Sequence, residues 1–144
     1  MQELKGSFVA LVTPMKSNGE IDFPALKELV EWHIESGTHG LVSVGTTGES
    51  ATLNFNDHVK VLEKTISYIN NEIVAIAGTG ANSTDEAIEL NKAASSIGYE
   101  FALSVTPYYN KPNQPGLEAH YKKIADSSEI KNILYNEHSR TACD

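Results

Sequence analysis

The segment Gly45-Thr46-Thr47-Gly48-Glu49-Ser50 combines small, hydroxylated and acidic residues directly after the apolar run 40–44. A loop of this kind between a strand and a helix presents backbone N–H groups and a helix N-terminus to an anion such as a carboxylate or a phosphate. An ordinary connection, in which Ser50 or Thr52 caps the next helix, fits the same residues. The composition therefore predicts either an anion-binding loop or a plain strand-to-helix connection.

The elements that would position this loop follow from the pattern of apolar residues. Continuous apolar runs predict buried strands, and apolar residues three and four apart predict helices. We expect strands over residues 8–13, 40–44, 73–77, 101–106 and 132–135, and helices over about 22–36, 56–70, 84–97 and 117–127. Strands that alternate with helices in this way predict an α/β protein with a parallel sheet and right-handed crossovers.

Two architectures fit this alternation, an open doubly wound sheet and part of a (β/α)₈ barrel. Both place the functional site at the carboxyl ends of the strands. The first loop lacks the GxGxxG pattern of dinucleotide-binding sheets, which favours the barrel. A complete barrel needs about 250 residues, whereas the chain has 144. We therefore expect residues 1–144 to form the N-terminal part of a single barrel domain, with five strands and four helices.

The composition excludes several classes of partner. The net charge of −8 and the absence of a basic run argue against binding to nucleic acid or to an anionic membrane. No stretch approaches the roughly 20 apolar residues of a membrane span, and the start resembles no secretory signal. With one cysteine, Cys143, the expectation is a cytoplasmic protein. Glu137, His138, Cys143 and Asp144 match no metal-binding spacing, so no metal is expected.

Four motifs occur in order at the predicted strand ends. They are Gly45 to Leu53, Ala77-Gly78-Thr79-Gly80-Ala81-Asn82, Thr106-Pro107-Tyr108-Tyr109-Asn110-Lys111-Pro112, and Ile133-Leu134-Tyr135-Asn136 followed by Ser139-Arg140-Thr141. Together they resemble the dihydrodipicolinate synthase family of pyruvate-dependent class I aldolases and lyases, which are (β/α)₈ barrels. The resemblance covers the whole chain but only the first half of a family member. N-acetylneuraminate lyase, a relative within the same superfamily, is a weaker match to the Thr-Thr pair and to the arginine.

The resemblance implies a reaction and a role for each matching residue. In this family pyruvate forms an imine with a lysine and condenses with aspartate semialdehyde, on the route to diaminopimelate and lysine, without a metal or an organic cofactor. Thr47 matches the residue that binds the pyruvate carboxylate, and Arg140 the group that receives the semialdehyde carboxylate. Thr46, Tyr109 and Tyr135 match a proton relay in which Tyr135 is the general acid and base. A phenol of ordinary pKa, about 10, needs neighbouring hydroxyl groups to move protons near neutrality.

The resemblance also implies an assembly and a weaker regulatory site. Family members form homotetramers that are dimers of dimers, in which the aromatic pair matched by Tyr108 and Tyr109 lies at the dimer interface, and Tyr109 matches a tyrosine that reaches the neighbouring subunit's site. Six residues match a lysine feedback site between two subunits: Ser50, Ala51, His58, Asn82, Glu86 and Tyr108. Phe55 stands where lysine-sensitive members often have a polar residue.

The chain departs from the family pattern in several places. The imine-forming lysine of the family lies beyond residue 144, and the lysines present fall on predicted helices, in loops or near the terminus, where burial does not lower an amine pKa. The chain alone is therefore not expected to run the full reaction. Glu137-His138 stands where family members usually have an aliphatic residue and a proline. Val74-Ala75 replaces the usual Pro-Val, and Gly98-Tyr99-Glu100 replaces a Gly-Ala-Asp-like turn.

The departures leave a second hypothesis, an inactive half-barrel that pairs with another chain through its open sheet edge. Taken singly, each candidate also has a structural interpretation. An isolated tyrosine more often packs than reacts, and an isolated arginine is a solvated charge. We expect His33, which lies on the apolar face of a predicted helix, to be a core histidine, and His58 and His120 to lie on helix surfaces. The functional interpretation therefore depends on the motifs occurring together and in order.

Overall fold

The computed structural model describes residues 4–143 and contains one parallel sheet of five strands in the order β1-β2-β3-β4-β5. Each strand pairs in parallel with the next one along the chain. The strands are β1 (Phe8–Ala10), β2 (Gly40–Ser43), β3 (Val74–Gly78), β4 (Phe101–Val105) and β5 (Lys131–Tyr135). The helices are α1 (Phe23–Glu35), α2 (Phe55–Ile69), α3 (Thr84–Ile97), α4 (Gln114–Ala125) and α5 (His138–Thr141), with a 3₁₀ turn, η1, at Ser50–Thr52.

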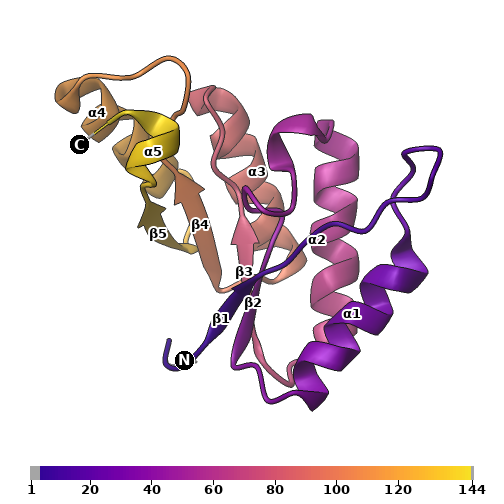
Figure 1. Ribbon diagram of the computed structural model, residues 1–144. Coiled ribbons are helices and arrows are strands. Elements are labelled where there is room, and N and C mark those ends of the chain that lie inside the picture. Colours follow the sequence, from indigo (N-terminus) through magenta and orange to yellow (C-terminus); the bar gives the residue numbers. More distant parts are fainter. Residues whose placement is uncertain (1–3, 144) are drawn as a thin grey trace.

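The helices α1 to α4 form one layer against one face of the sheet (Figure 1). Each of them contacts the next helix in chain order. A doubly wound sheet reverses its strand order at a switch point and carries helices on both faces, whereas this sheet keeps the sequential order of a barrel. The structure therefore decides between the two architectures in favour of an incomplete barrel. Within residues 4–143, β1 and β5 each pair on one side only.

Alternating side chains of the strands divide the core between the two faces of the sheet. Leu41, Ala77 and Ala102 are fully buried and pack in the same cluster as residues of α1, α2 and α3. On the other face, which corresponds to a barrel interior, a smaller cluster contains Val42, Ile76 and Phe101. Adjacent residues such as 41 and 42 point to opposite faces, as the two-residue period of a strand requires.

Capping residues set where two helices begin. Asn54 is the N-cap of α2 and accepts a hydrogen bond from the Asp57 N–H at 2.9 Å, so neither Ser50 nor Thr52, the caps named in the alternative interpretation of the loop, caps this helix. Helix α4 begins at Gln114, because Asn113 accepts from the Gly116 N–H at 2.9 Å. In α1 the predicted N-cap is correct, since Asp22 accepts from the Ala25 N–H.

Strand β1 is shorter than the predicted run 8–13. The N–H of Leu11 still donates to the Val42 carbonyl at 2.9 Å, but the chain then leaves the sheet. The hydroxyl of Thr13, which is buried, instead donates to the carbonyl of Gly48 at 2.7 Å. The end of the predicted strand therefore supports the loop after β2 rather than the sheet.

The predictions for His58 and His120 are wrong, because both side chains are buried, with 3% and 6% of their surface exposed. Nε2 of His58 donates to the Gly78 carbonyl at 2.7 Å, and Nδ1 of His120 lies 2.9 Å from the Thr84 hydroxyl. His33 is half-buried, with Nδ1 3.2 Å from the Thr38 hydroxyl.

Within the segment 98–100, only Tyr99 packs into the core. Tyr99 is 4% exposed and donates its hydroxyl to the Leu62 carbonyl at 2.8 Å, and Glu100 forms an ion pair with Lys131 at 2.6 Å. No helix within residues 4–143 combines the length and the apolar character needed to cross a bilayer.

Candidate active site

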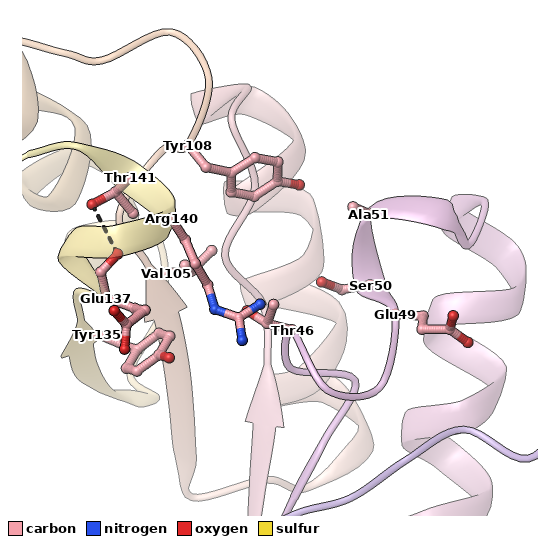
Figure 2. Close-up of a pocket in the computed structure, with 10 residues that line it drawn as sticks. All are labelled: Thr46, Glu49, Ser50, Ala51, Val105, Tyr108, Tyr135, Glu137, Arg140 and Thr141. Atoms are coloured by element: carbon pink, nitrogen blue, oxygen red, sulfur yellow. Dashed lines mark hydrogen bonds between the residues drawn. The ribbon is translucent and has the colours of Figure 1, made fainter.

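A pocket of about 210 Å³ lies at the carboxyl ends of the strands (Figure 2). Its walls come from the loop after β2, the end of β4, the loop that follows β4, the end of β5 and the short helix α5. The lining residues are Thr46, Glu49, Ser50, Ala51, Val105, Tyr108, Tyr135, Glu137, Arg140 and Thr141. The pocket therefore occupies the edge at which the alternation of strands and helices predicts the functional site.

The loop after β2 is held in a specific backbone conformation. Val44, just before the loop, has a φ of 53°, which a β-branched residue rarely adopts. A Cβ at Gly78 on the neighbouring strand would lie 2.2 Å from the Val44 carbonyl oxygen, so only glycine fits at that position. The hydrogen bond from Thr13 holds the Gly48 carbonyl from the other side. These contacts determine the path of residues 45–50.

The same loop leaves hydrogen-bond donors available. No acceptor among residues 4–143 takes a hydrogen bond from the backbone N–H groups of Thr46 and Thr47, and both side chains are exposed. The N–H of Glu49, by contrast, closes a turn onto the Thr46 carbonyl at 3.0 Å. Two adjacent donors beside two hydroxyl groups form an arrangement that suits a carboxylate.

On the opposite wall, β5 and α5 provide the phenol and the guanidinium. Figure 2 shows the guanidinium group of Arg140 directed into the space between Tyr135 and the loop that carries Thr46, with the Tyr135 hydroxyl facing the same space. No carboxylate among residues 4–143 lies within ion-pair distance of Arg140. Its charge is therefore available to an anion that enters the pocket.

Glu137 adds a carboxylate to the pocket that the motif comparison did not assign to the site. Its Oε1 accepts from the hydroxyl and the backbone N–H of Ser139, at 2.6 and 3.1 Å, and so caps α5. These two hydrogen bonds, and then the charge of Arg140, lower the pKa of the Glu137 carboxyl. The sequence signal that could have pointed to Glu137 is an anionic residue two positions after Tyr135, which ends β5.

Three of the five residues with predicted catalytic or substrate-binding roles line this pocket: Thr46, Tyr135 and Arg140. Thr47 lies in the same loop but outside the lining, and the residue is exposed. Tyr109 also lies outside the lining. It is 90% exposed and has a φ of 71°. The structure thus brings the first three together and leaves Tyr109 exposed and outside this chain's own pocket.

A second pocket, of about 150 Å³, shares a wall with the first. All six residues of the predicted lysine site line it: Ser50, Ala51, His58, Asn82, Glu86 and Tyr108. Asn82 Oδ1 accepts from the backbone N–H of Tyr108 at 2.9 Å. Burial, and then the charge of Glu86, raise the pKa of the Tyr108 phenol. Ser50, Ala51 and Tyr108 line both pockets.

The part of the chain that the structure describes holds no group of three or more His, Cys, Asp or Glu side chains that could bind a metal ion. Of the terminal cluster considered from the sequence, Asp144 lies outside the described residues. Cys143 is buried, with its Sγ 3.6 Å from the Pro112 carbonyl. Burial lowers the pKa of His58 and, separately, that of His120.

Comparison with known proteins connects this geometry to a family. The sequence model of the dihydrodipicolinate synthetase family matches residues 3–144. The chain belongs to this family. The prediction made from the four motifs is therefore confirmed, and so is the predicted fold, an incomplete barrel.

Relatives within the dihydrodipicolinate synthetase family are close in sequence and in structure. A 4-hydroxy-tetrahydrodipicolinate synthase from Ruthia magnifica is 60% identical over 141 residues, which are 98% of this chain and 48% of the relative. A chloride-inhibited dihydrodipicolinate synthase from Acinetobacter baumannii, solved with pyruvate, is 55% identical with a TM-score of 0.96, and the match covers 99% of this chain and 49% of that one.

A third relative, the family enzyme from Cyanidioschyzon merolae solved with lysine bound, is 39% identical with a TM-score of 0.90, over 94% of this chain and 47% of that one. The chain thus spans about half the length of the family members that it matches.

Proposed function

We propose that residues 1–144 form the N-terminal part of the single barrel domain of a 4-hydroxy-tetrahydrodipicolinate synthase, a cytoplasmic lyase of diaminopimelate and lysine biosynthesis. The observation that supports this most is the meeting of Thr46, Tyr135 and Arg140 at one pocket. Its substrates would be pyruvate and aspartate semialdehyde, each of which carries a carboxylate. The relative from Acinetobacter baumannii was solved with pyruvate.

In this proposal each wall of the pocket binds a substrate group or transfers a proton. The unused N–H groups of Thr46 and Thr47, with the Thr47 hydroxyl, would hold the pyruvate carboxylate. The planar guanidinium of Arg140 would receive the semialdehyde carboxylate. Thr46 and Tyr135 would pass a proton between them, and Tyr135 would exchange it with the reacting carbon skeleton. The lysine that forms the imine lies beyond residue 144 in the family, so this chain provides the binding and proton-transfer side of the site.

The assembly proposed with this function is a homotetramer. Tyr109 is the most exposed of the large apolar side chains within residues 4–143. A second copy that covers Tyr109 would remove its ring from water and would bring its hydroxyl to the neighbouring site, where it would complete the relay. Sedimentation analysis tests this: the proposal expects association that weakens when Tyr109 is replaced by Ala, and a wild-type monomer at all concentrations would contradict it.

Pyruvate binding by this chain tests the site. NMR titration of the labelled chain with pyruvate should shift the amide signals of Thr46 and Thr47, and Thr47→Val should weaken binding by about tenfold, because a charged hydrogen bond is lost. Thr52→Val is the matched control, because the Thr52 hydroxyl already donates to the Glu49 carbonyl at 3.0 Å and is not free to donate to a carboxylate. Binding that is equally strong in the Thr47 and Thr52 variants would overturn the proposed carboxylate site.

Covalent trapping tests whether any lysine of this chain forms an imine with pyruvate. Borohydride reduction in the presence of pyruvate, followed by intact mass measurement, should give no adduct on the 144-residue chain, because the imine-forming lysine is not in it. A stable adduct would show that one of its own lysines forms the imine. The alternative, an inactive half-barrel that pairs with another chain, predicts that pyruvate also fails to bind before reduction.

The second pocket supports a proposal of lysine feedback. Its six predicted residues all line one hollow, and the Cyanidioschyzon merolae relative was solved with lysine bound. The Glu86 carboxylate would pair with a lysine ammonium group and the Asn82 amide with its polar end. Calorimetry with L-lysine at millimolar concentration is expected to show binding that Glu86→Gln abolishes. L-norleucine, whose side chain carries no charge, is the control ligand. No heat with L-lysine would contradict it.

A further inference from the structure

The short helix α5, which carries Arg140, is closed by a ring of hydrogen bonds that involves two side chains. The hydroxyl of Thr141 donates to Asn136 Oδ1 at 2.6 Å. The amide Nδ2 of Asn136 donates to the Cys143 carbonyl at 2.9 Å, and the N–H of Cys143 donates back to the Thr141 hydroxyl at 3.3 Å. The ring joins Asn136, which follows β5, to Thr141 and Cys143, which come after Arg140 in the chain.

The ring matters because α5 has few interactions of its own. It spans four residues, and a single helical turn is not stable by backbone hydrogen bonds alone. Thr141 is 1% exposed, so its hydroxyl has no access to water if the bond to Asn136 is lost, and the Glu137 carbonyl at 3.3 Å is then its remaining acceptor. The Cys143 carbonyl takes a further bond from Nδ1 of His138 at 3.0 Å, a nitrogen that must carry the proton because a carbonyl only accepts.

The side chain of Arg140 depends on this backbone for its direction. It makes no hydrogen bond or ion pair with any residue of the described range 4–143. A long side chain without partners keeps most of its rotamer freedom. What directs the guanidinium into the pocket is therefore the position of the Arg140 backbone, which the ring sets relative to the end of β5 and to Tyr135 (Figure 2).

We infer that Asn136 and Thr141 are positioning residues for Arg140. Their hydrogen bond holds α5 so that the guanidinium faces the pocket, and neither side chain needs to touch the substrate. The inference rests on the proposed role of Arg140 in receiving a carboxylate. It assigns part of the affinity for that carboxylate to two side chains whose polar atoms are engaged within the ring of hydrogen bonds.

Thr141→Val and Thr141→Ser make a matched pair for the test. Valine keeps the shape of threonine but leaves Asn136 Oδ1 without its donor and the Cys143 N–H without its acceptor. Serine keeps the hydroxyl. The labelled chain is used for two measurements: the heteronuclear NOE of the Arg140 backbone amide without ligand, and titration with succinate, which serves as a carboxylate probe, followed at Arg140 Nε.

We expect a high NOE for the Arg140 backbone amide in the wild-type chain, a clear fall in Thr141→Val and recovery in Thr141→Ser. The dissociation constant for succinate should rise about fivefold in Thr141→Val, while the pyruvate-induced shifts at Thr46 and Thr47 remain. A purely structural role would weaken both ligands together. Asn136→Ala should behave as Thr141→Val does.

Two results would overturn the inference: an Arg140 backbone amide that is mobile in the wild-type chain, or one that is equally ordered in the valine variant. The first measurement needs no ligand, so it separates this inference from the proposed function. If succinate fails to perturb Arg140 in the wild-type chain while the NOE pattern is as expected, the carboxylate role of Arg140 is wrong and its positioning by Asn136 and Thr141 is upheld.

Discussion

Nε2 of His58 lies 2.7 Å from the carbonyl oxygen of Gly78, across the interface between α2 and the end of β3. A carbonyl only accepts, so Nε2 carries the proton, and the bond satisfies a buried group at the last residue of the strand. Gly78 is also the residue whose missing Cβ lets Val44 turn into the loop of the candidate site. One histidine of α2 therefore supports the strand end against which that loop is built.

The burial of His58 and His120 predicts that the chain loses stability as the pH falls. Burial lowers the pKa of each below the ordinary 6.5. Below that pH the unfolded chain binds protons that the folded chain does not, so the free energy of unfolding should decrease by up to about 1.4 kcal/mol per pH unit for each histidine. Urea unfolding between pH 7.5 and 5 measures the slope.

His58→Gln provides the control for this slope. Glutamine keeps an N–H donor for Gly78 but does not titrate, so the pH dependence should become shallower even if the variant is less stable at pH 7.5. A slope unchanged by this substitution would show that His58 does not contribute to it.

Gly78→Ala should destabilise the chain strongly, because the new Cβ would lie 2.2 Å from the Val44 carbonyl oxygen, which is backbone and cannot easily shift. We expect a loss on the order of 2–4 kcal/mol in the free energy of unfolding. Gly45→Ala is the matched control, since its nearest contact would be an ordinary 3.7 Å. Chemical denaturation of both variants decides the point, and equal losses would contradict the proposed close approach.

Thr13→Val should lower the local stability of the loop 45–50 without changing its conformation. The substitution removes the donor to the Gly48 carbonyl and leaves a buried acceptor unsatisfied, at a cost of about 1–3 kcal/mol. Thr13→Ser, which keeps the hydroxyl, should recover most of this. Hydrogen exchange of the amides of residues 45–50 is expected to quicken in the valine variant and to stay slow in the serine variant. Equal exchange in both would exclude Thr13 as a support for the loop.

Glu137→Gln should strengthen the binding of anions in the candidate site. A glutamine oxygen can still accept from Ser139, so the cap of α5 is retained, while one negative charge leaves the pocket that also contains Arg140. Because the carboxylate is exposed, the gain should be small, about two- to fivefold in the dissociation constant for succinate at low salt. The gain in affinity for succinate should become smaller at high salt. A gain that does not depend on salt concentration would contradict an electrostatic origin.

The sequence pattern predicted the strands and the four longer helices well, and it failed where contacts between distant residues override local preference. His58 stands three and four residues before Val61 and Leu62, on the buried side of α2, but its polar type favoured the surface. Its burial depends on the carbonyl of Gly78, which helical periodicity cannot show. Helix α5 was missed because it is a single turn, and its closure comes from Asn136 and Cys143 outside it.

What the sequence by itself determined is the alternation of buried strands with amphipathic helices, the placing of the motifs at strand ends and, through those motifs, the family. These follow from the order and spacing of residues along the chain. Tertiary contacts alone place helices α1 to α4 on a single face of the sheet, bring Thr46, Tyr135 and Arg140 to one pocket, and leave Tyr109 outside it. The physical reason is that packing and hydrogen bonding between remote segments decide which side chains meet, and these are not properties of any local stretch.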